Sequence, residues 1–356
     1  MSNIDFGLPQ LEGILIIAIG GCGTKIGKLL YEKNYTVYFI NSSEQDQSIL
    51  NDVPDYLKFK MLGTKGANGN REKSKMFIKA NYRKIIRDIT TKFESYTHYF
   101  ILTSTSGGTG SGSSILLSRF IKQLCPDKSV SFIPILPSFN ESYQRKLNTL
   151  SFYNELLECN LDDFSSMFFV DNNNANSNGE LDDFNTKVIA SLDYIFNLSR
   201  NTTNIDDADL LQLLNCSGCV NVFYIDQKKP IDTYRLKIDS MFAESQGNAK
   251  YALYDINTDD DVLEYEVNER FGQQDDTLYT FRDDANKLLI LFGLDLPYEY
   301  FEIIGEYCEE HNQNKLRTNK NSSDRKIIVN NTIQQSKQIN TTKSIDDIFN
   351  NLFGSK

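Results

Sequence analysis

Short apolar runs alternate with amphipathic segments along the first part of the chain. The runs "ILIIAI", "TVYFI", "YFILTST" and "SVSFIPIL" have the length of strands, whereas "YRKIIRDITTKF" and "SILLSRFIKQL" carry apolar residues at helical spacing. This alternation predicts an α/β fold with a doubly wound, mostly parallel sheet. Because the carboxyl ends of parallel strands meet at one edge, we expect the glycine- and asparagine-rich loops after these strands to converge there.

The pattern changes twice in the rest of the chain. Residues 181–200 predict one long helix, with apolar residues at Phe184, Val188, Leu192, Ile195 and Phe196. From Asn312 the chain is rich in Asn, Gln, Ser, Thr and Lys, a composition typical of disorder. We therefore expect a Rossmann-like domain over 1–180, a central connecting helix over 181–203, a smaller α+β domain over 204–310 and a basic tail over 311–356.

The charge is distributed unevenly. The 356 residues carry a net charge of −11, but residues 311–356 alone carry +5. An acidic body argues against a protein that coats nucleic acid, and a basic tail suggests that the two parts meet different partners. The sequence has no apolar run long enough to span a bilayer and no secretory signal pattern, and its six cysteines form no framework. We expect a cytoplasmic protein without a membrane partner.

Two glycine clusters stand between a strand pattern and a helix pattern. They are "GGCGT" at 20–24 and "SGGTGSGS" at 106–113, and this arrangement aims backbone N–H groups and a helix N-terminus at an anion. The alternative interpretation of such a composition is a flexible linker. The Walker pattern is absent, and Gly21, Gly23 and Gly27 give only a loose dinucleotide pattern, so an oxidoreductase remains an alternative.

The pair of glycine clusters resembles the tubulin/FtsZ superfamily, whose signature is a G-G-T-G-[ST]-G loop. The resemblance continues in order through "INSSEQ", "KGANGN", "SFNESYQR" and "NIDDAD", and covers most of residues 14–210. With its short length and basic tail, the chain looks more like the TubZ-type plasmid and phage segregation proteins than like the bacterial division proteins. The implied fold is tubulin-like: a GTP-binding domain, a long central helix, an activation domain, and a C-terminal helix with a flexible tail.

The resemblance implies that the chain binds GTP or GDP with Mg²⁺. Backbone N–H groups of the second glycine cluster would hold the β- and γ-phosphates, Glu141 the ribose, and Phe184 the base. Val188 stands where the family has a base-reading Asn, which leaves Asn185 or Asn172 for that task, and Ser106 replaces a glycine. The implied contacts are Gly20, Gly21, Cys22, Gly23, Asn41, Gln45, Ala67, Asn68, Ser106, Gly107, Gly108, Thr109, Gly110, Ser111, Glu141, Arg145, Asn172, Phe184 and Asn185.

The motif "NIDDAD" matches a catalytic loop of the family at Asn204, Asp206 and Asp209. These residues follow the long helix, whose length of about 27 Å places them at the pole opposite the nucleotide. They would then act on the GTP of a neighbour stacked head to tail, a contact that generates a filament. The alternatives are a solvated turn between helix and strand, or a structural protein that holds nucleotide without hydrolysing it.

The tail and a cysteine pair carry further hypotheses. Ser344 as N-cap and the apolar residues Ile345, Ile348, Phe349, Leu352 and Phe353 predict an amphipathic helix. The tail would meet a DNA-binding adaptor at a centromere-like DNA site, in segregation of plasmid or phage DNA; cell division and phage positioning are alternatives, as is a tail that is merely solvated. Cys216 and Cys219 form a C-x-x-C without a second pair, which favours buried thiols over a zinc or redox site.

Overall fold

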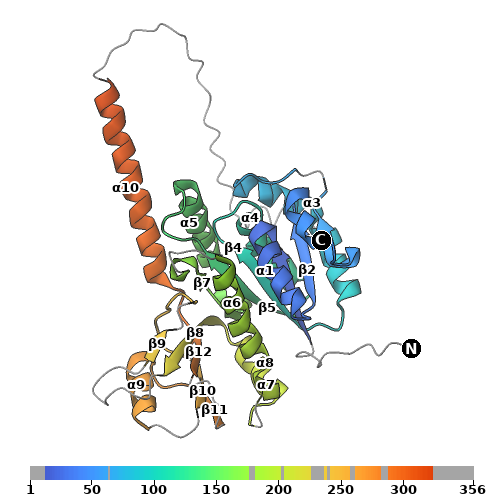
Figure 1. Cartoon of the computed structure of the whole chain (residues 1–356), viewed down its shortest axis with the longest axis vertical. Helices are drawn as coiled ribbons and strands as arrows, with labels where there is room; N and C mark the ends of the chain where they lie inside the picture. The colour runs from blue at the N-terminus through green and yellow to red at the C-terminus, as the bar shows by residue number, and fades with distance from the viewer. Residues whose placement is uncertain are drawn as a thin grey trace, which may run out of the picture. The chain divides into compact units, whose positions relative to one another are not determined.

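A mixed sheet of 12 strands organises the part of the chain that the computed structural model describes, which is residues 13–62, 65–175, 181–201, 204–225, 236–238, 241–256, 261–281 and 288–323 (Figure 1). Its parallel part runs in the order β3-β2-β1-β4-β5-β6-β8. These strands are β1 (Ile14–Ile19), β2 (Val37–Asn41), β3 (Lys58–Lys60), β4 (His98–Ser104), β5 (Ser129–Leu136), β6 (Ser166–Met167) and β8 (Gly218–Ile225). The predicted doubly wound, parallel α/β arrangement is confirmed.

Helices connect and cover these strands. Strand β1 is buried at all of its positions, which its continuous apolar run predicts for a strand covered on both faces. Two helices begin inside the glycine clusters, so these clusters form first helical turns rather than extended loops. The principal helices of this part are α1 (Gly20–Glu32), α3 (Arg71–Lys92), α4 (Thr109–Leu124), α5 (Tyr143–Leu157) and α6 (Leu181–Phe196), with a short α2 (Glu44–Gln47).

The helix predicted over 181–200 is interrupted. Helix α6 ends at Phe196, and a short α7 (Leu198–Asn201) follows it. Asn197 lies at the break: its backbone nitrogen still donates to the Asp193 carbonyl at 3.1 Å, and its Nδ2 donates to the same oxygen at 2.8 Å. The single long helix of the sequence prediction is therefore wrong at its last turn.

The remaining strands extend the same sheet. Strands β8, β12 (Leu288–Leu294) and β10 (Tyr251–Ile256) pair antiparallel in that order, and β11 (Asp276–Phe281) pairs parallel with β10 at the edge. Strand β7 (Val170–Asp171) pairs with β5, and β9 (Leu236–Ile238) with β8. The intervening helices are α8 (Asp207–Asn215) and α9 (Asp261–Phe271). The sheet passes from β6 to β8 without a break, and the division into domains at residues 180 and 203 stays a prediction.

Helix α10 (Tyr298–Ser323) continues past Asn312, where the composition predicts the end of regular structure. The chain through His311 forms one compact unit, and Asn312–Lys356 forms a second. The amphipathic segment predicted at 344–353 lies outside the residues that the structure describes. Within the described ranges, every helix is too short or too polar to cross a membrane.

Candidate functional site

A cavity of about 430 Å³ lies at the carboxyl edge of the parallel strands, within the usual size range for small-molecule sites. Twelve of the predicted nucleotide contacts lie on its wall: Gly20, Gly21, Cys22, Gln45, Ala67, Asn68, Ser106, Gly107, Gly108, Thr109, Gly110 and Arg145. The structure adds residues that the sequence did not indicate: Ile19, Ser43, Asp46, Lys65, Gly66, Gly69 and Ser104. The loops expected to converge on one face do so.

Two helix N-termini meet at this cavity. A Cβ atom at Gly20, in the first turn of α1, would lie 2.8 Å from the Gly110 nitrogen in the first turn of α4. A Cβ at Gly110 would lie 2.4 Å from Thr103 Oγ1 and 2.9 Å from the Ile19 carbonyl oxygen. Glycine therefore allows both helices to start directly on the strand ends, with their unpaired N–H groups and positive dipole ends facing the same space.

A third loop closes the cavity from the side of α3. It turns at residues with positive φ, which are Gly66 at +87°, Asn68 at +51° and Gly69 at +73°. A Cβ at Gly69 or at Gly107 would meet nothing within 4 Å, so both backbones face open space. Bare backbone of this kind can approach an anion closely, and the residues present fit a phosphate group.

Charged side chains complete the wall. Lys65 and Arg145 line the cavity, so it holds more positive charge than the glycine clusters alone indicated. Arg145 Nη1 donates to Glu141 Oε2 at 2.5 Å, which ties the predicted ribose contact to the cavity wall. Asp46 leans over the first turn of α1, since a Cβ at Gly21 would lie 3.0 Å from its Oδ2. A carboxylate beside a polyphosphate site is a suitable partner for a hydrated Mg²⁺ ion.

The thiol of Cys22 faces this cavity as a neutral group. Burial, with a contribution from the nearby Glu141 carboxylate, raises the pKa of Cys22 to about 12. The thiolate is therefore absent near neutral pH, and Cys22 places no negative charge beside an incoming anion. This also argues against a nucleophilic role for this cysteine.

Seven predicted contacts are not part of the cavity wall as the structure describes it: Gly23, Asn41, Ser111, Glu141, Asn172, Phe184 and Asn185. Three of them support the wall from behind. Asn41 Oδ1 accepts from the backbone nitrogens of Ser42 and Ser43, and Ser111 Oγ donates to the Gly107 carbonyl. Gly23 lets α1 pack on β4, since a Cβ there would lie 2.7 Å from the Leu102 carbonyl oxygen.

The other four are the residues expected to contact the base and the ribose. Phe184 and Asn185 are buried in the first turns of α6. Asn172 Oδ1 is buried, and in the described part of the chain it has no hydrogen-bond partner. A buried oxygen without a partner is unusual in a folded protein, and a hydrogen-bond donor on a bound ligand would supply the missing partner. The roles of these residues stay predictions.

Helix α10 holds the loop that carries Glu141. Tyr300 OH donates to the Pro137 carbonyl, and the Tyr300 ring stacks on Phe139 with centroids 5.1 Å apart. Tyr307 packs against the same Phe139 ring at 5.8 Å and lies under the Lys146 ammonium at 4.2 Å. The loop between β5 and α5 is therefore fixed by aromatic packing.

Asp206 and Asp209 form a capping box at the start of α8. Asp206 Oδ1 accepts from the backbone nitrogens of Ala208 and Asp209 at 2.8 and 2.9 Å, and Asp209 Oδ2 accepts from the Asp206 nitrogen at 3.0 Å. The D-x-x-D spacing is itself a capping signal, which the sequence interpretation as a catalytic loop did not use. Asp206 and Asn204 are exposed, and Asp209 is half-buried.

This capping box lies at the edge of the sheet opposite the cavity. The last turn of α6 is tied to Tyr35, two residues before β2, because Tyr35 OH donates to Asp193 Oδ1 at 2.8 Å and accepts from Asn197 at 2.8 Å. Helix α6 has 16 residues, or about 24 Å, and α7 and α8 follow at its far end (Figure 1). The carboxylates of Asp206 and Asp209 are thus far from the cavity of their own chain.

The C-x-x-C pair is placed as buried thiols, which confirms that interpretation. Burial raises the pKa of Cys216 to about 11 and that of Cys219 to about 12. Among the residues placed by the structure, no group of three or more His, Cys, Asp and Glu side chains is arranged to hold a metal ion.

Comparison with known proteins also points to a nucleotide-binding protein of tubulin-like fold. Residues 13–179 match the Tubulin/FtsZ family, GTPase domain. The chain is 24% identical over 220 residues to the tubulin-like protein TubZ of Clostridium botulinum C phage, and this match spans 60% of each protein. The structure resembles the tail-truncated TubZ of Clostridium botulinum phage c-st, with a TM-score of 0.74 and 21% identity over 85% of this chain and 98% of that one.

A further likeness is to a GTPγS-form protofilament of TubZ from Bacillus thuringiensis serovar israelensis. Its TM-score is 0.67, with 17% identity over 86% of this chain and 95% of that one. The ordered motifs, the cavity at two helix N-termini and these matches agree. The chain has a tubulin-like fold, and its residues 13–179 match the GTPase domain of the Tubulin/FtsZ family.

Proposed function

We infer that the chain binds GTP and GDP in the edge cavity, hydrolyses GTP and assembles head to tail into filaments. The observation that carries this proposal is the separation of two half-sites on opposite edges of one sheet. The cavity offers groups that bind phosphate, whereas the carboxylates of exposed Asp206 and half-buried Asp209 lie about one domain depth away. A second copy of the chain would bring the two together.

In the bound state, the first turns of α1 and α4 would hold the phosphates with backbone N–H groups, and Lys65 and Arg145 would balance the charge. Glu141 would accept from the ribose hydroxyls, and Phe184 would pack on the base. The Asn172 oxygen is buried and has no hydrogen-bond partner among the described residues, which supports it as the guanine reader, because guanine offers N–H donors on the matching edge. Asn185 is the second candidate for this task.

Asp46 fits a Mg²⁺ ion held partly through water, since it is the carboxylate on the cavity wall. When bound, the ion would supply charge neutralisation on the phosphate oxygens. The protein residues would orient the nucleotide and exclude competing water from its phosphates.

Hydrolysis would be completed in trans. The Asp206 and Asp209 carboxylates of one subunit would orient and polarise the attacking water at the terminal phosphate of the next. A contact between the carboxylate edge of one copy and the cavity edge of another is heterologous and does not close, so it builds a filament. The TubZ of Bacillus thuringiensis with a similar fold forms a protofilament, which supports a filament of this kind.

For the biological task we propose segregation of plasmid or phage DNA, with the basic tail contacting a DNA-binding adaptor. The support is the similarity to a phage TubZ and the charge of +5 over residues 311–356. Truncation after Ser323, where α10 ends, should abolish adaptor binding and leave GTP hydrolysis intact. A truncated chain that still captures the adaptor on its DNA would contradict this role of the tail.

The decisive experiment measures phosphate release per molecule against protein concentration, with sedimentation in parallel. Wild type should hydrolyse GTP only above a threshold concentration, at which it also pellets. Asp209→Asn should pellet but release phosphate at least about a hundredfold more slowly, because the amide cannot serve as a base. Asparagine can still accept the capping hydrogen bond, so this variant separates catalysis from helix capping.

Asp207→Asn is the matched control, with the same charge change at an exposed neighbouring position, and it should behave as wild type. Turnover that is independent of concentration, without pelleting, would contradict hydrolysis in trans. If Asp209→Asn and Asp206→Asn both keep full turnover, the carboxylates only cap α8. The chain would then be closer to a nucleotide-binding structural protein.

A further inference from the structure

Asn148, on the second turn of α5, contacts two loops of the cavity at once. Its side-chain Nδ2 donates to the Gly69 and Ser106 carbonyl oxygens, both at 2.9 Å, and approaches the Gly107 carbonyl at 3.3 Å. These acceptors lie in the loop before α3 and in the glycine cluster before α4. Only 4% of Asn148 is exposed, so water cannot replace these bonds easily.

The direction of these bonds fixes the direction of the opposite backbone groups. In a trans peptide the C=O and N–H bonds point to opposite sides. Because Asn148 holds the Ser106 carbonyl on its own side, the N–H of Gly107 points away from α5. The same holds for the Gly107 carbonyl and the N–H of Gly108. Both residues lie on the cavity wall, so these N–H groups are available to a phosphate bound in the cavity.

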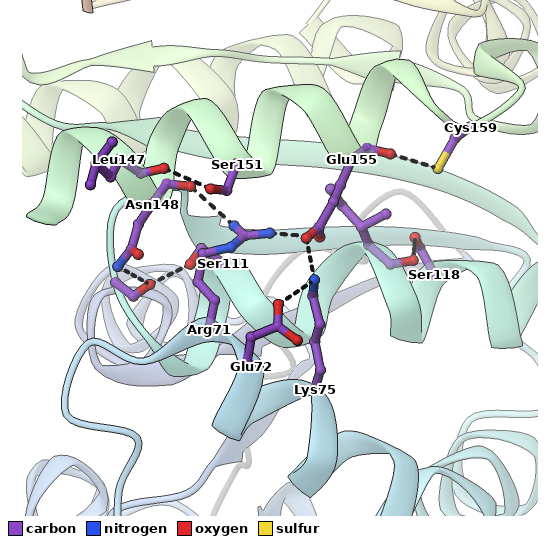
Figure 2. A network of polar contacts seen from close by, with 12 residues as sticks. Arg71, Glu72, Lys75, Ser111, Ser118, Leu147, Asn148, Ser151, Glu155 and Cys159 are labelled. Carbon is purple, nitrogen blue, oxygen red and sulfur yellow. Dashed lines mark hydrogen bonds and ion pairs between the residues drawn. The ribbon is translucent and has the colours of Figure 1, made fainter. Parts of the chain in front are cut away.

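Neighbouring side chains hold Asn148 itself. Gln144 Nε2 donates to Asn148 Oδ1 at 3.2 Å, which orients the amide so that its NH₂ group faces the loops. Arg71 Nη1 donates to the Asn148 carbonyl at 3.2 Å, and Arg71 Nη2 lies 2.6 Å from Glu155 Oε2. Figure 2 shows Arg71 between Asn148 and Glu155, with Lys75 bonded to both Glu155 and Glu72. The first turn of α3 is thereby tied to α5.

The loop before α3 is a thin partition. Asn68 and Gly69 line the nucleotide cavity on one side and, on the other, a second cavity of about 460 Å³ bounded by Arg71, Gln144, Ser151 and Glu155. At its closest point the partition touches the glycine cluster, where a Cβ on Gly108 would lie 2.8 Å from the Gly69 nitrogen. With open space on both sides, the loop depends on the bonds at its ends for its position.

We propose that Asn148 is a positioning residue that sets the discrimination between GTP and GDP. Its hydrogen bonds hold the partition loop against the glycine cluster and orient the Gly107 and Gly108 N–H groups toward the γ-phosphate, which GTP has and GDP lacks. This inference rests on the proposed function of the cavity, and it adds a residue that does not itself touch the nucleotide.

The test is binding of GDP and of GTPγS, each with Mg²⁺, to the full chain at a concentration below that of assembly. Asn148→Asp keeps the shape of the side chain and replaces the two donor hydrogens with an acceptor. We expect its affinity for GTPγS to fall about tenfold more than its affinity for GDP. Asn154→Asp, the same substitution at an exposed position of the same helix, should leave the ratio of the two affinities unchanged.

If Asn148→Asp leaves the ratio of the GTPγS and GDP affinities unchanged, the positioning role is overturned. If Asn148→Asp fails to fold by circular dichroism, Asn148→Ser decides. Serine offers one donor hydrogen, and the affinity ratio should shift in the same direction by a smaller factor; an unchanged ratio again overturns the inference. A wild-type chain that binds neither nucleotide would contradict the proposed function instead, so the two failures are distinguishable.

Discussion

The two edges of the parallel sheet differ in what they offer to a ligand. At the carboxyl edge, backbone groups of α1, α4 and the loop before α3 surround a cavity with Lys65 and Arg145 on its wall. At the amino edge, the carboxylates of Asp206, which is exposed, and Asp209, which is half-buried, are engaged in capping α8. One edge is built to receive an anion, and the other presents negative charge.

This difference explains why, by our proposal, one chain binds nucleotide but needs a second to hydrolyse it. The carboxyl edge depends on backbone geometry, which requires glycine and tight packing. The amino edge depends on a short polar segment whose local fold is ensured by its own capping box. Substitutions should therefore affect the two edges in different ways.

The largest expected effect is on the carboxyl edge. Gly108→Ala would place a Cβ 2.8 Å from the Gly69 nitrogen and 2.9 Å from the Asn70 nitrogen, both rigid backbone atoms. The loops must then separate, and we expect nucleotide affinity, measured with a fluorescent GDP analogue, to fall about a hundredfold. Gly305→Ala, where a Cβ meets nothing within 4 Å, is the matched control and should bind as wild type. Equal nucleotide affinities for the two variants would show that the loops can move apart around the added Cβ without losing the binding site.

The sequence predicts the carboxyl edge well because its chemistry lies in local patterns. Strand runs followed by glycine clusters indicate where the chain turns, and the turns of a parallel sheet share an edge. Lys65 was not predicted as a contact, because its place depends on how the loop after β3 folds back. Asn148 was not predicted either, since its partners are backbone carbonyls 79 and 42 residues away. No side-chain pattern marks such acceptors.

The amino edge was predicted less completely. The D-x-x-D spacing fits both a catalytic loop and a capping box, and sequence alone does not separate two roles that the same carboxylates can hold. The apolar spacing continues to Phe196 and does not indicate that the helix is interrupted at Asn197. The end of α10 at Ser323 was missed because composition indicates how polar a segment is, while helical pairing decides its structure.

A second prediction concerns acid and the amino edge. Burial lowers the pKa of His98, at the start of β4, to about 3, and its ring bonds to Ser131, which reaches the Leu214 carbonyl at the end of α8. Below the ordinary histidine pKa of about 6.5, His98 binds a proton in the unfolded chain but stays neutral in the folded chain. The free energy of unfolding should therefore fall as pH falls, by about 2 kcal/mol at pH 5.

His98→Phe should remove this part of the pH dependence. The new ring can still stack on Phe100, and Ser131 keeps Ser166 as a partner at 3.2 Å. Urea unfolding of both proteins at pH 7 and pH 5 measures the effect. If the two proteins lose the same stability over this interval, the buried histidine is not its source.

The smallest expected effect separates the two roles of the amino edge. Asp206→Ala removes the acceptor for the Ala208 and Asp209 nitrogens and should lower the free energy of unfolding by about 1 kcal/mol. Asp206→Asn keeps an acceptor of equal capping strength and should unfold as wild type does. Urea denaturation at pH 7 compares the two. The asparagine variant keeps the fold of this edge and loses only the charge, so a loss of GTP turnover in it would show that the carboxylate takes part in hydrolysis. Equal destabilisation by both variants would instead mean that the negative charge itself stabilises α8.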